Sequence, residues 1–269
     1  MNKTQPLIIA HRGASALAPE NTLASFRKAI EHVAEGIEFD VRLSKDGVPV
    51  VFHDSKLSRI CGTDQKVSSL NLNQLNEFDI GSWFNKKYPM LANASFADER
   101  IKSLVETLEF LADYKGVIYV ELKCKEDAVK DLTKAVCEII KTSPLLSQII
   151  VKSFNLDALP LIARYCSKAK TGALFAPDAK ILLRKEKRLI KVAKELKADR
   201  LSLHFSLATK KLMAKAENAD LPVTIWTADS PRWIKRGLKL GIDHIITNDP
   251  AKLIAKRYDL LRNGSIMVE

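Results

Sequence analysis

Cysteine is scarce in this chain, and its distribution argues against two common kinds of site. The four cysteines among 269 residues are widely spaced, at Cys61, Cys124, Cys137 and Cys166. They form no C-x-x-C pair and no short Cys/His ligand pattern, so neither a structural zinc site nor a redox motif is indicated. A Gly-rich dinucleotide loop is also absent, which argues against an open, doubly wound sheet.

Long apolar runs are missing as well. The N-terminal segment MNKTQPLIIAHRG holds only a few apolar residues before charge resumes, too few for the core of a signal peptide. No later segment approaches the roughly 20 apolar residues that a membrane span needs. We therefore expect a soluble, cytoplasmic protein without stable membrane insertion.

Positive charge dominates the chain. The formal net charge is +11, which implies attraction to anions such as a phosphodiester, a nucleic acid or an acidic membrane surface. Much of the excess lies in residues 184–197 and 231–241, where Lys and Arg alternate with apolar residues at helical spacing. These two stretches hold a single aromatic residue, Trp233, and so lack the aromatic interleaving of single-strand binders. We interpret these stretches as solvated outer faces of helices and expect no nucleic-acid partner.

Strand-like and helix-like segments alternate along the whole chain. Eight short strand-like runs are each followed by an amphipathic helix-like stretch, and eight is the number that closes a parallel barrel. The length suits one such barrel, since these folds commonly have about 250 residues. We therefore predict that residues 1–269 form a single eight-stranded parallel β/α barrel of the TIM type, with strands near residues 7–10, 36–43, 117–122, 149–154, 171–176, 200–205, 223–228 and 242–247.

The second unit of this barrel carries an insertion. The sequence SKDGVP predicts a tight turn at Asp46 and Gly47, and VPVVFHD predicts a return strand that carries His53 back toward the second strand. Residues from about 55 to 101 lack sustained periodicity. We predict that they form a small cap over the barrel mouth, with a short helix at 72–78. The aromatic side chains of Trp83, Phe84 and Tyr88 are expected to pack inside this cap.

Two carboxylates and two histidines stand where the early strands end. Glu38 and Asp40 are two residues apart, so in a strand both side chains project from one face. A half-buried strand with one wet face would show the same alternation, and for this pair alone that interpretation stays open. His11 ends the preceding strand and His53 the following one. Histidines on both sides of paired acids favour a functional site, with a hard metal ion between two proton-transfer groups.

A third carboxylate joins this group once the barrel forms. Active sites of such barrels lie at the carboxyl ends of the strands, where Glu121 and Lys123 repeat the two-residue spacing. Three converging carboxylates suit Mg²⁺ or Ca²⁺ better than zinc, for which more His or Cys ligands are expected. A salt bridge between Glu121 and Lys123 inside the barrel is the alternative for that pair.

Four longer motifs occur in order along the chain: HRGASALAPENTLASF at 11–26, GIEFDVRLSKDGVPVVFHD at 36–54, YVELK at 119–123 and VTIWTAD at 223–229. Together they resemble the glycerophosphodiester phosphodiesterase family over nearly the whole chain. The resemblance is weakest over residues 55–101. Near the C-terminus the family pattern ITD-x-P is replaced by IITNDP, so Asn248 stands in the place of an acid.

The resemblance implies a metal-dependent hydrolysis of glycerophosphodiesters, such as glycerophosphocholine or glycerophosphoethanolamine, to glycerol 3-phosphate and an alcohol, within glycerol and lipid metabolism. It also implies that His11 and His53 are the acid–base pair, and either could be the acid. The implied ligands of the divalent ion, Mg²⁺ or Ca²⁺, are Glu38, Asp40 and Glu121.

Three further residues would contact this substrate. Arg12 and Lys123 can neutralise the phosphoryl oxygens, the first as a bidentate fork and the second as a point charge. By the resemblance, Trp226 forms an apolar wall for the glycerol, and a core tryptophan is the alternative. The run PENT at 19–22 is compatible both with a helix cap by Asn21 or Thr22 and with a polar contact in the site.

Two other functions stay open. A lysophospholipase D-type activity would act on the same core with an acyl chain attached, and would need an apolar groove, for which residues 83–91 are the candidate segment. A non-catalytic barrel could instead use its basic surface to bind nucleic acid or an anionic membrane. The matched histidines and acids argue against this second alternative. A homo-oligomer is compatible with the sequence.

Overall fold

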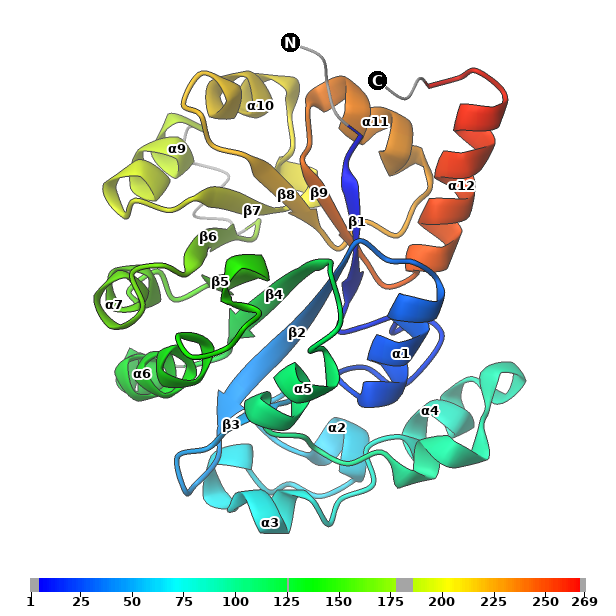
Figure 1. The fold of residues 1–269 in the computed structure, drawn as a ribbon, viewed down its shortest axis with the longest axis vertical. Helices are drawn as coiled ribbons and strands as arrows, with labels where there is room; N and C mark the ends of the chain where they lie inside the picture. Colours follow the sequence, from blue (N-terminus) through cyan, green and yellow to red (C-terminus); the bar gives the residue numbers. More distant parts are fainter. Residues whose placement is uncertain (1–4, 125, 178–185, 267–269) are drawn as a thin grey trace.

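A closed ring of parallel strands forms the centre of the molecule (Figure 1). The computed structural model describes residues 5–124, 126–177 and 186–266. Within these residues nine strands form one sheet, and all except β3 run parallel and close into a ring where β1 pairs with β2. The predicted eight-stranded barrel is therefore confirmed, with strands β1 (Leu7–His11), β2 (Gly36–Leu43), β4 (Val117–Leu122), β5 (Ile149–Ser153), β6 (Lys170–Phe175), β7 (Arg200–His204), β8 (Val223–Trp226) and β9 (His244–Thr247).

Helices surround the ring on its outside (Figure 1). Local sequence fixes several of their ends: the Thr22 side chain caps α1 in a capping box with Ser25, and Gly241 ends α11 at a left-handed φ of 70°. The apolar faces of the helices pack against strand residues such as Ile37 and Val151. One main helix follows each strand or strand pair of the ring: α1 (Leu23–Glu31), α5 (Leu104–Phe110), α6 (Val129–Ile140), α7 (Ala158–Tyr165), α9 (Glu186–Glu195), α10 (Lys210–Glu217), α11 (Arg232–Leu240) and α12 (Pro250–Arg262).

The register of four neighbouring strands brings the predicted site residues to one level. His11 of β1 lies opposite Glu38 of β2. Asp40 of β2 lies opposite Glu121 of β4, which in turn lies opposite Lys152 of β5. Because side chains alternate with a period of two, a slip of one residue between β2 and β4 would separate the acids onto opposite faces of the sheet. The site therefore depends on the register in which these four strands pair.

A polar network lies inside the barrel around the amino-terminal ends of several strands. The hydroxyl of the fully buried Tyr119 is 2.6 Å from Nδ1 of His244. Arg200 donates from Nη1 to the same ring nitrogen at 2.7 Å, and its Nη2 pairs with Asp243 at 2.6 Å. Burial and the Arg200 guanidinium lower the pKa of His244 to about 3. This histidine is therefore neutral at ordinary pH and belongs to the barrel floor.

The inserted segment follows an extra strand outside the ring. The chain turns at Gly47, whose φ is 78°, and returns as β3 (Pro49–Val51), antiparallel to β2, as the sequence predicts. Beyond β3 the segment packs its own apolar core, which includes Leu57, Leu75 and Ile80, against Val50. It contains the α-helices α2 (Ser58–Cys61), α3 (Leu72–Leu75) and α4 (Ser82–Lys87) and the 3₁₀ helices η1 (Val67–Ser69), η2 (Pro89–Leu91) and η3 (Ala94–Asp98). Helix α3 lies inside the predicted short helix.

The aromatic residues of the insertion differ in how they pack. Phe84 is fully buried and contacts the ring of Phe96 at 5.7 Å between centroids. The Tyr88 ring lies 4.8 Å from that of Phe84, but 38% of the residue is exposed. The expectation that Tyr88 packs the cap therefore holds only in part. Among all the residues that the structure describes, no helix combines the length and apolar character needed to cross a bilayer.

Candidate active site

Three acids meet at the carboxyl ends of the neighbouring strands β2 and β4. Glu38, Asp40 and Glu121 are all buried, and one carboxylate oxygen of each lies within 4.8 Å of the others. Glu38 Oε1, Asp40 Oδ1 and Glu121 Oε1 each lie in an ion pair with a lysine and have no other polar partner among the described residues. Buried carboxylates this close together repel one another unless positive charge lies among them. The donor set therefore fits a hard divalent ion.

Basic side chains surround the acid cluster. Lys152 Nζ lies 2.9 Å from Glu38 Oε1, and Lys123 Nζ lies 3.2 Å from Asp40 Oδ1 and also contacts Glu121. These ion pairs neutralise part of the negative charge of the cluster. Burial alone would raise the pKa of both Glu38 and Asp40, but the neighbouring Lys152 and Lys123 hold both values below their ordinary range. The two carboxylates are thus charged and ready to bind a cation.

Lys152 is the site residue that sequence analysis missed. It lies in β5, is 1% exposed, and contacts Glu121 Oε2 at 3.2 Å in addition to Glu38. A lone lysine one residue before the end of the apolar run IIVKS was the available indication. The next residue, Ser153, ends β5 and donates its hydroxyl to the backbone oxygen of Leu122 at 3.1 Å.

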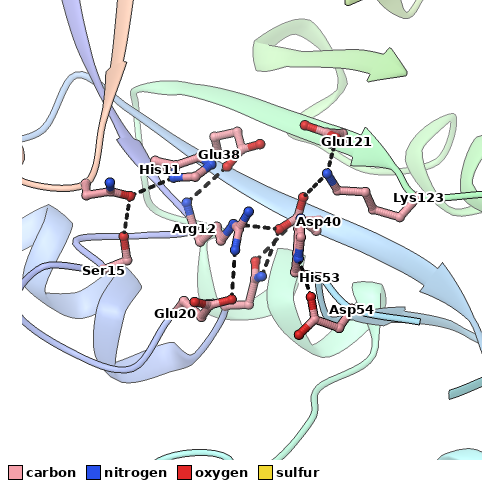
Figure 2. A network of polar contacts seen from close by, with 12 residues as sticks. His11, Arg12, Ser15, Glu20, Glu38, Asp40, His53, Asp54, Glu121 and Lys123 are labelled. Atoms are coloured by element: carbon pink, nitrogen blue, oxygen red, sulfur yellow. Dashed lines mark hydrogen bonds and ion pairs between the residues drawn. The ribbon is translucent and has the colours of Figure 1, made fainter. Parts of the chain in front are cut away.

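His11 is held from behind by Asn248. Its Nδ1 lies 2.7 Å from Asn248 Oδ1, which also accepts a hydrogen bond from the Ser15 hydroxyl at 2.9 Å (Figure 2). The amide nitrogen of Asn248 donates to Asp229 Oδ2 at 2.8 Å, and this contact fixes which way the amide points. Nδ1 of His11 therefore carries the hydrogen, and Nε2 is left for the reacting groups.

His53 is oriented in the same manner by a different partner. Its Nδ1 lies 2.6 Å from Asp54 Oδ1, and Arg59 Nε donates to Asp54 Oδ2 at 2.6 Å. Burial, together with the cations Arg12 and Lys123, lowers the pKa of His53 against the opposing influence of Asp40 and Asp54. Figure 2 shows His11 beside Glu38 and His53 beside Asp40, so the two rings lie at different edges of the acid cluster.

Arg12 connects the acid cluster to the inserted segment. Its Nε lies 3.1 Å from Asp40 Oδ2, and its Nη1 donates to Glu20 Oε1 at 2.9 Å. Glu20 also accepts hydrogen bonds from Arg59 of the inserted segment, at 2.6 and 3.0 Å. Beside Glu20, Asn21 donates to Asp40 Oδ2 at 2.9 Å. Both interpretations of the run PENT are thus realised, because Thr22 caps the helix while Glu20 and Asn21 contact the site.

Aromatic rings stand beside the cluster. Trp226 ends β8 and makes edge-to-face contacts with Phe154, at 5.4 Å between centroids, and with His204, at 5.3 Å. Phe154 is 45% exposed, and Lys123 Nζ lies 5.6 Å from the centre of its ring. Trp226 is partly buried, and it packs against Phe154, the ring that lies next to Lys123. The prediction from sequence named Trp226 for the apolar wall but did not include Phe154.

Comparison with known proteins places this geometry in context. The model of the glycerophosphoryl diester phosphodiesterase family matches residues 11–252. A glycerophosphodiester phosphodiesterase of Caldanaerobacter subterraneus is 31% identical over 96% of this chain and 98% of its own. An Oleispira antarctica phosphodiesterase, solved with the product sn-glycerol-3-phosphate, superimposes with a TM-score of 0.82, 28% identity and coverage of 94% and 97%. The glycerophosphodiester phosphodiesterase of Thermotoga maritima gives a TM-score of 0.73, 27% identity and coverage of 93% and 97%.

Proposed function

The chain belongs to the glycerophosphoryl diester phosphodiesterase family and is an enzyme of that activity, and from this premise we propose its substrates and its mechanism. The proposed substrates are glycerophosphodiesters such as glycerophosphocholine and glycerophosphoethanolamine, and the products are glycerol 3-phosphate and an alcohol. The glycerol phosphate found in the Oleispira antarctica enzyme supports this choice. The alternative of a non-catalytic barrel is set aside. We further propose that residues 1–269 act as one catalytic unit, with residues 55–101 as its cap.

The observation that carries the proposal is the convergence of three buried carboxylates between two oriented histidines. Glu38, Asp40 and Glu121 would bind Mg²⁺ or Ca²⁺, because one carboxylate oxygen of each lies within 4.8 Å of the others and hard cations prefer oxygen ligands. When bound, the ion would supply positive charge beside the phosphoryl oxygens. The oxygen-only donor set makes zinc a poor candidate.

His11 and His53 act as the acid–base pair in this proposal. Both rings have Nδ1 engaged, by Asn248 and by Asp54, so each offers Nε2 to the substrate. One ring accepts the proton of the attacking hydroxyl, and the other donates a proton to the departing oxygen. The attacking group is a water molecule, which gives glycerol 3-phosphate directly, or the neighbouring glycerol 2-hydroxyl, which gives a five-membered cyclic phosphate that a water molecule then opens to glycerol 3-phosphate.

Arg12 and Lys123 position the phosphodiester. Both cations lie at the edge of the acid cluster, where their side chains are 17% and 14% exposed, so they can reach a bound anion while they stay paired with Asp40. Trp226 and Phe154 form the apolar wall beside Lys123 that would contact the carbon face of the glycerol.

A substrate panel tests the proposal. Glycerophosphocholine, glycerophosphoethanolamine and lysophosphatidylcholine are incubated with the enzyme, with Mg²⁺ or Ca²⁺ and with excess EDTA, and the release of glycerol 3-phosphate and of choline is measured. We expect glycerol 3-phosphate from the first two substrates and no turnover in EDTA. Full turnover in EDTA, or a wild-type rate for Glu38→Ala, would remove the metal from the mechanism. Faster choline release from lysophosphatidylcholine than from glycerophosphocholine would favour the lysophospholipase D alternative.

A further inference from the structure

The end of the inserted segment exposes apolar and basic side chains together. Residues 86–91, which we call the tip, are Lys86, Lys87, Tyr88, Pro89, Met90 and Leu91, and every one of them is exposed. Met90 is 96% exposed, Leu91 41% and Tyr88 38%. Large apolar side chains are usually withdrawn from water when the fold allows it, so a group of three at the end of one loop requires an explanation.

The tip is held in this outward position by well-packed residues at its base. Tyr88 follows α4 and rests on the buried ring of Phe84, and η2 then carries Met90 and Leu91 away from the cap core. The side chain of Asn85 closes the loop, because its Nδ2 donates to the backbone oxygen of Asn93 at 2.8 Å and its Oδ1 accepts from the Asn93 N–H at 3.0 Å. The exposure of Met90 and Leu91 is therefore built into the fold.

The charge of the tip is of one sign. Lys86 and Lys87 are both exposed, and the sequence holds no acidic residue between Asp79 and Asp98. Lys87 Nζ lies 5.2 Å from the centre of the Tyr88 ring. Lysine next to tyrosine, beside protruding aliphatic side chains, is the composition that suits the headgroup region of a bilayer. There, lysine pairs with headgroup phosphates while the apolar side chains enter the acyl boundary.

The tip is linked to the mouth of the barrel. The ring of Trp83, one turn before Lys87, lies 6.0 Å from the guanidinium carbon of Arg59. Arg59 donates to Asp54, the partner of His53. A surface that contacts the tip therefore lies close to the end of the barrel where the acids converge, rather than at the opposite floor.

We propose that the tip is a peripheral docking surface for the interface of an anionic phospholipid bilayer. A second copy of the chain fits the tip less well, because two lysine-bearing tips would repel each other across a twofold axis. The apolar area of three side chains is also small against the roughly 800 Å² per partner that stable interfaces bury. An anionic bilayer instead complements the lysines, and it accepts a small apolar insertion.

Vesicle sedimentation tests the apolar part of the tip. Wild type is expected to sediment with vesicles of phosphatidylcholine mixed with phosphatidylglycerol, and much less with phosphatidylcholine alone. The double variant Met90→Asp with Leu91→Asp should lose most of this binding. Tyr258→Asp on α12, where the residue is 59% exposed, is the matched control and should bind as wild type does. Equal sedimentation of the double variant and of this control, or no binding of wild type to anionic vesicles, would overturn the proposal.

Two charge variants distinguish vesicle binding by the tip from vesicle binding by the basic surface as a whole. Lys86→Gln with Lys87→Gln removes two charges from the tip, and Lys235→Gln with Arg236→Gln removes two exposed charges from α11. Each lysine near an anionic surface contributes about fivefold to binding, so the tip variant should lose roughly twenty-fivefold and the α11 variant far less. Equal losses would assign the binding to overall charge and overturn the proposal.

Activity and size measurements complete the test. The tip variants should keep the wild-type kcat/KM on water-soluble glycerophosphocholine, so a failure of this proposal is distinguishable from a failure of the proposed function. Light scattering reports the molecular mass of each variant without vesicles. A fall in mass caused by Met90→Asp with Leu91→Asp, without any change in vesicle binding, would identify a second copy as the occupant and overturn the bilayer assignment.

Discussion

His11 Nδ1 and Asn248 Oδ1 lie 2.7 Å apart and join the end of the first strand to the residue after the last. Asn248 stands where the family pattern has an acid, and its surroundings explain the amide. Its nitrogen donates to Asp229 Oδ2 at 2.8 Å while its oxygen faces His11. A carboxylate could accept from the histidine but would repel Asp229. An amide at position 248 therefore fits between His11 and Asp229 better than a carboxylate would.

The Asn248 contact predicts an unusual result for a substitution that restores the family pattern. Asn248→Asp should lower kcat/KM, by about tenfold to a hundredfold as for other residues that orient a histidine, because two carboxylates would then face each other. Asp229→Asn in addition should recover much of the activity, since an amide again faces a carboxylate. Steady-state kinetics of both variants check this. Asn248→Asp that is faster than wild type, or no recovery in the double variant, would refute the orienting role.

The two histidines should be separable by the leaving group. Replacement of either His11 or His53 by Ala should lower kcat on glycerophosphocholine by roughly 10²- to 10⁴-fold while the metal stays bound. A nitrophenyl ester of glycerol phosphate has a leaving group that needs little protonation, so the variant without the acid should recover much of its rate on that ester and the other should not. Calorimetric metal titration is the control. If both variants lost metal binding instead of catalytic rate, the histidines would be metal ligands and not an acid–base pair.

Lys152 should be essential for stability in the absence of metal. Lys152→Met leaves Glu38 and Glu121 buried with less compensating charge, and removal of one partner of a buried ion pair typically costs about 3–5 kcal/mol of unfolding free energy. Lys134→Met, whose exposed pair with Glu138 is 3.9 Å long, should change the unfolding free energy by less than about 1 kcal/mol. Urea unfolding in EDTA measures both. Similar losses for the two variants would contradict the prediction.

His244, in the polar network at the amino-terminal ends of the strands, should make the unfolding free energy fall as the pH is lowered. His244 has a folded-state pKa of about 3 against an ordinary 6.5, so between these values the unfolded chain binds the additional proton. Its contribution to the unfolding free energy is complete above pH 6.5 and is lost as the pH falls toward 3. Each pKa unit of difference corresponds to about 1.4 kcal/mol.

Urea unfolding of wild type and His244→Gln over that pH range tests this assignment. The variant is expected to be less stable near neutral pH but to lose less stability on acidification, because it lacks the titrating ring beside Arg200. The prediction concerns how steeply the unfolding free energy changes with pH, and this slope should differ between the two proteins. Parallel slopes would mean that other groups cause the acid loss.

The sequence predicted what is local and missed what depends on register. Eight strand–helix units were visible because apolar periodicity repeats along the chain, and Glu38, Asp40 and Glu121 were visible because acids in apolar strands are conspicuous. Lys152 was missed because its importance arises only where β5 lies beside β4, opposite Glu121. The pairing of Asn248 with His11 likewise depends on strands that are adjacent in space and distant along the chain. The catalytic roles of these residues stay predictions.

The pairing of β1 with β9 has a consequence for the time at which His11 is oriented. During synthesis His11 leaves the ribosome well before Asn248, so the ring of His11 has no oriented partner until β9 and Asn248 have been made. A nascent chain that already displays the three acids therefore still lacks the contact that orients His11. Synthesis of β9, rather than assembly of the acid cluster, is then the step that fixes this ring.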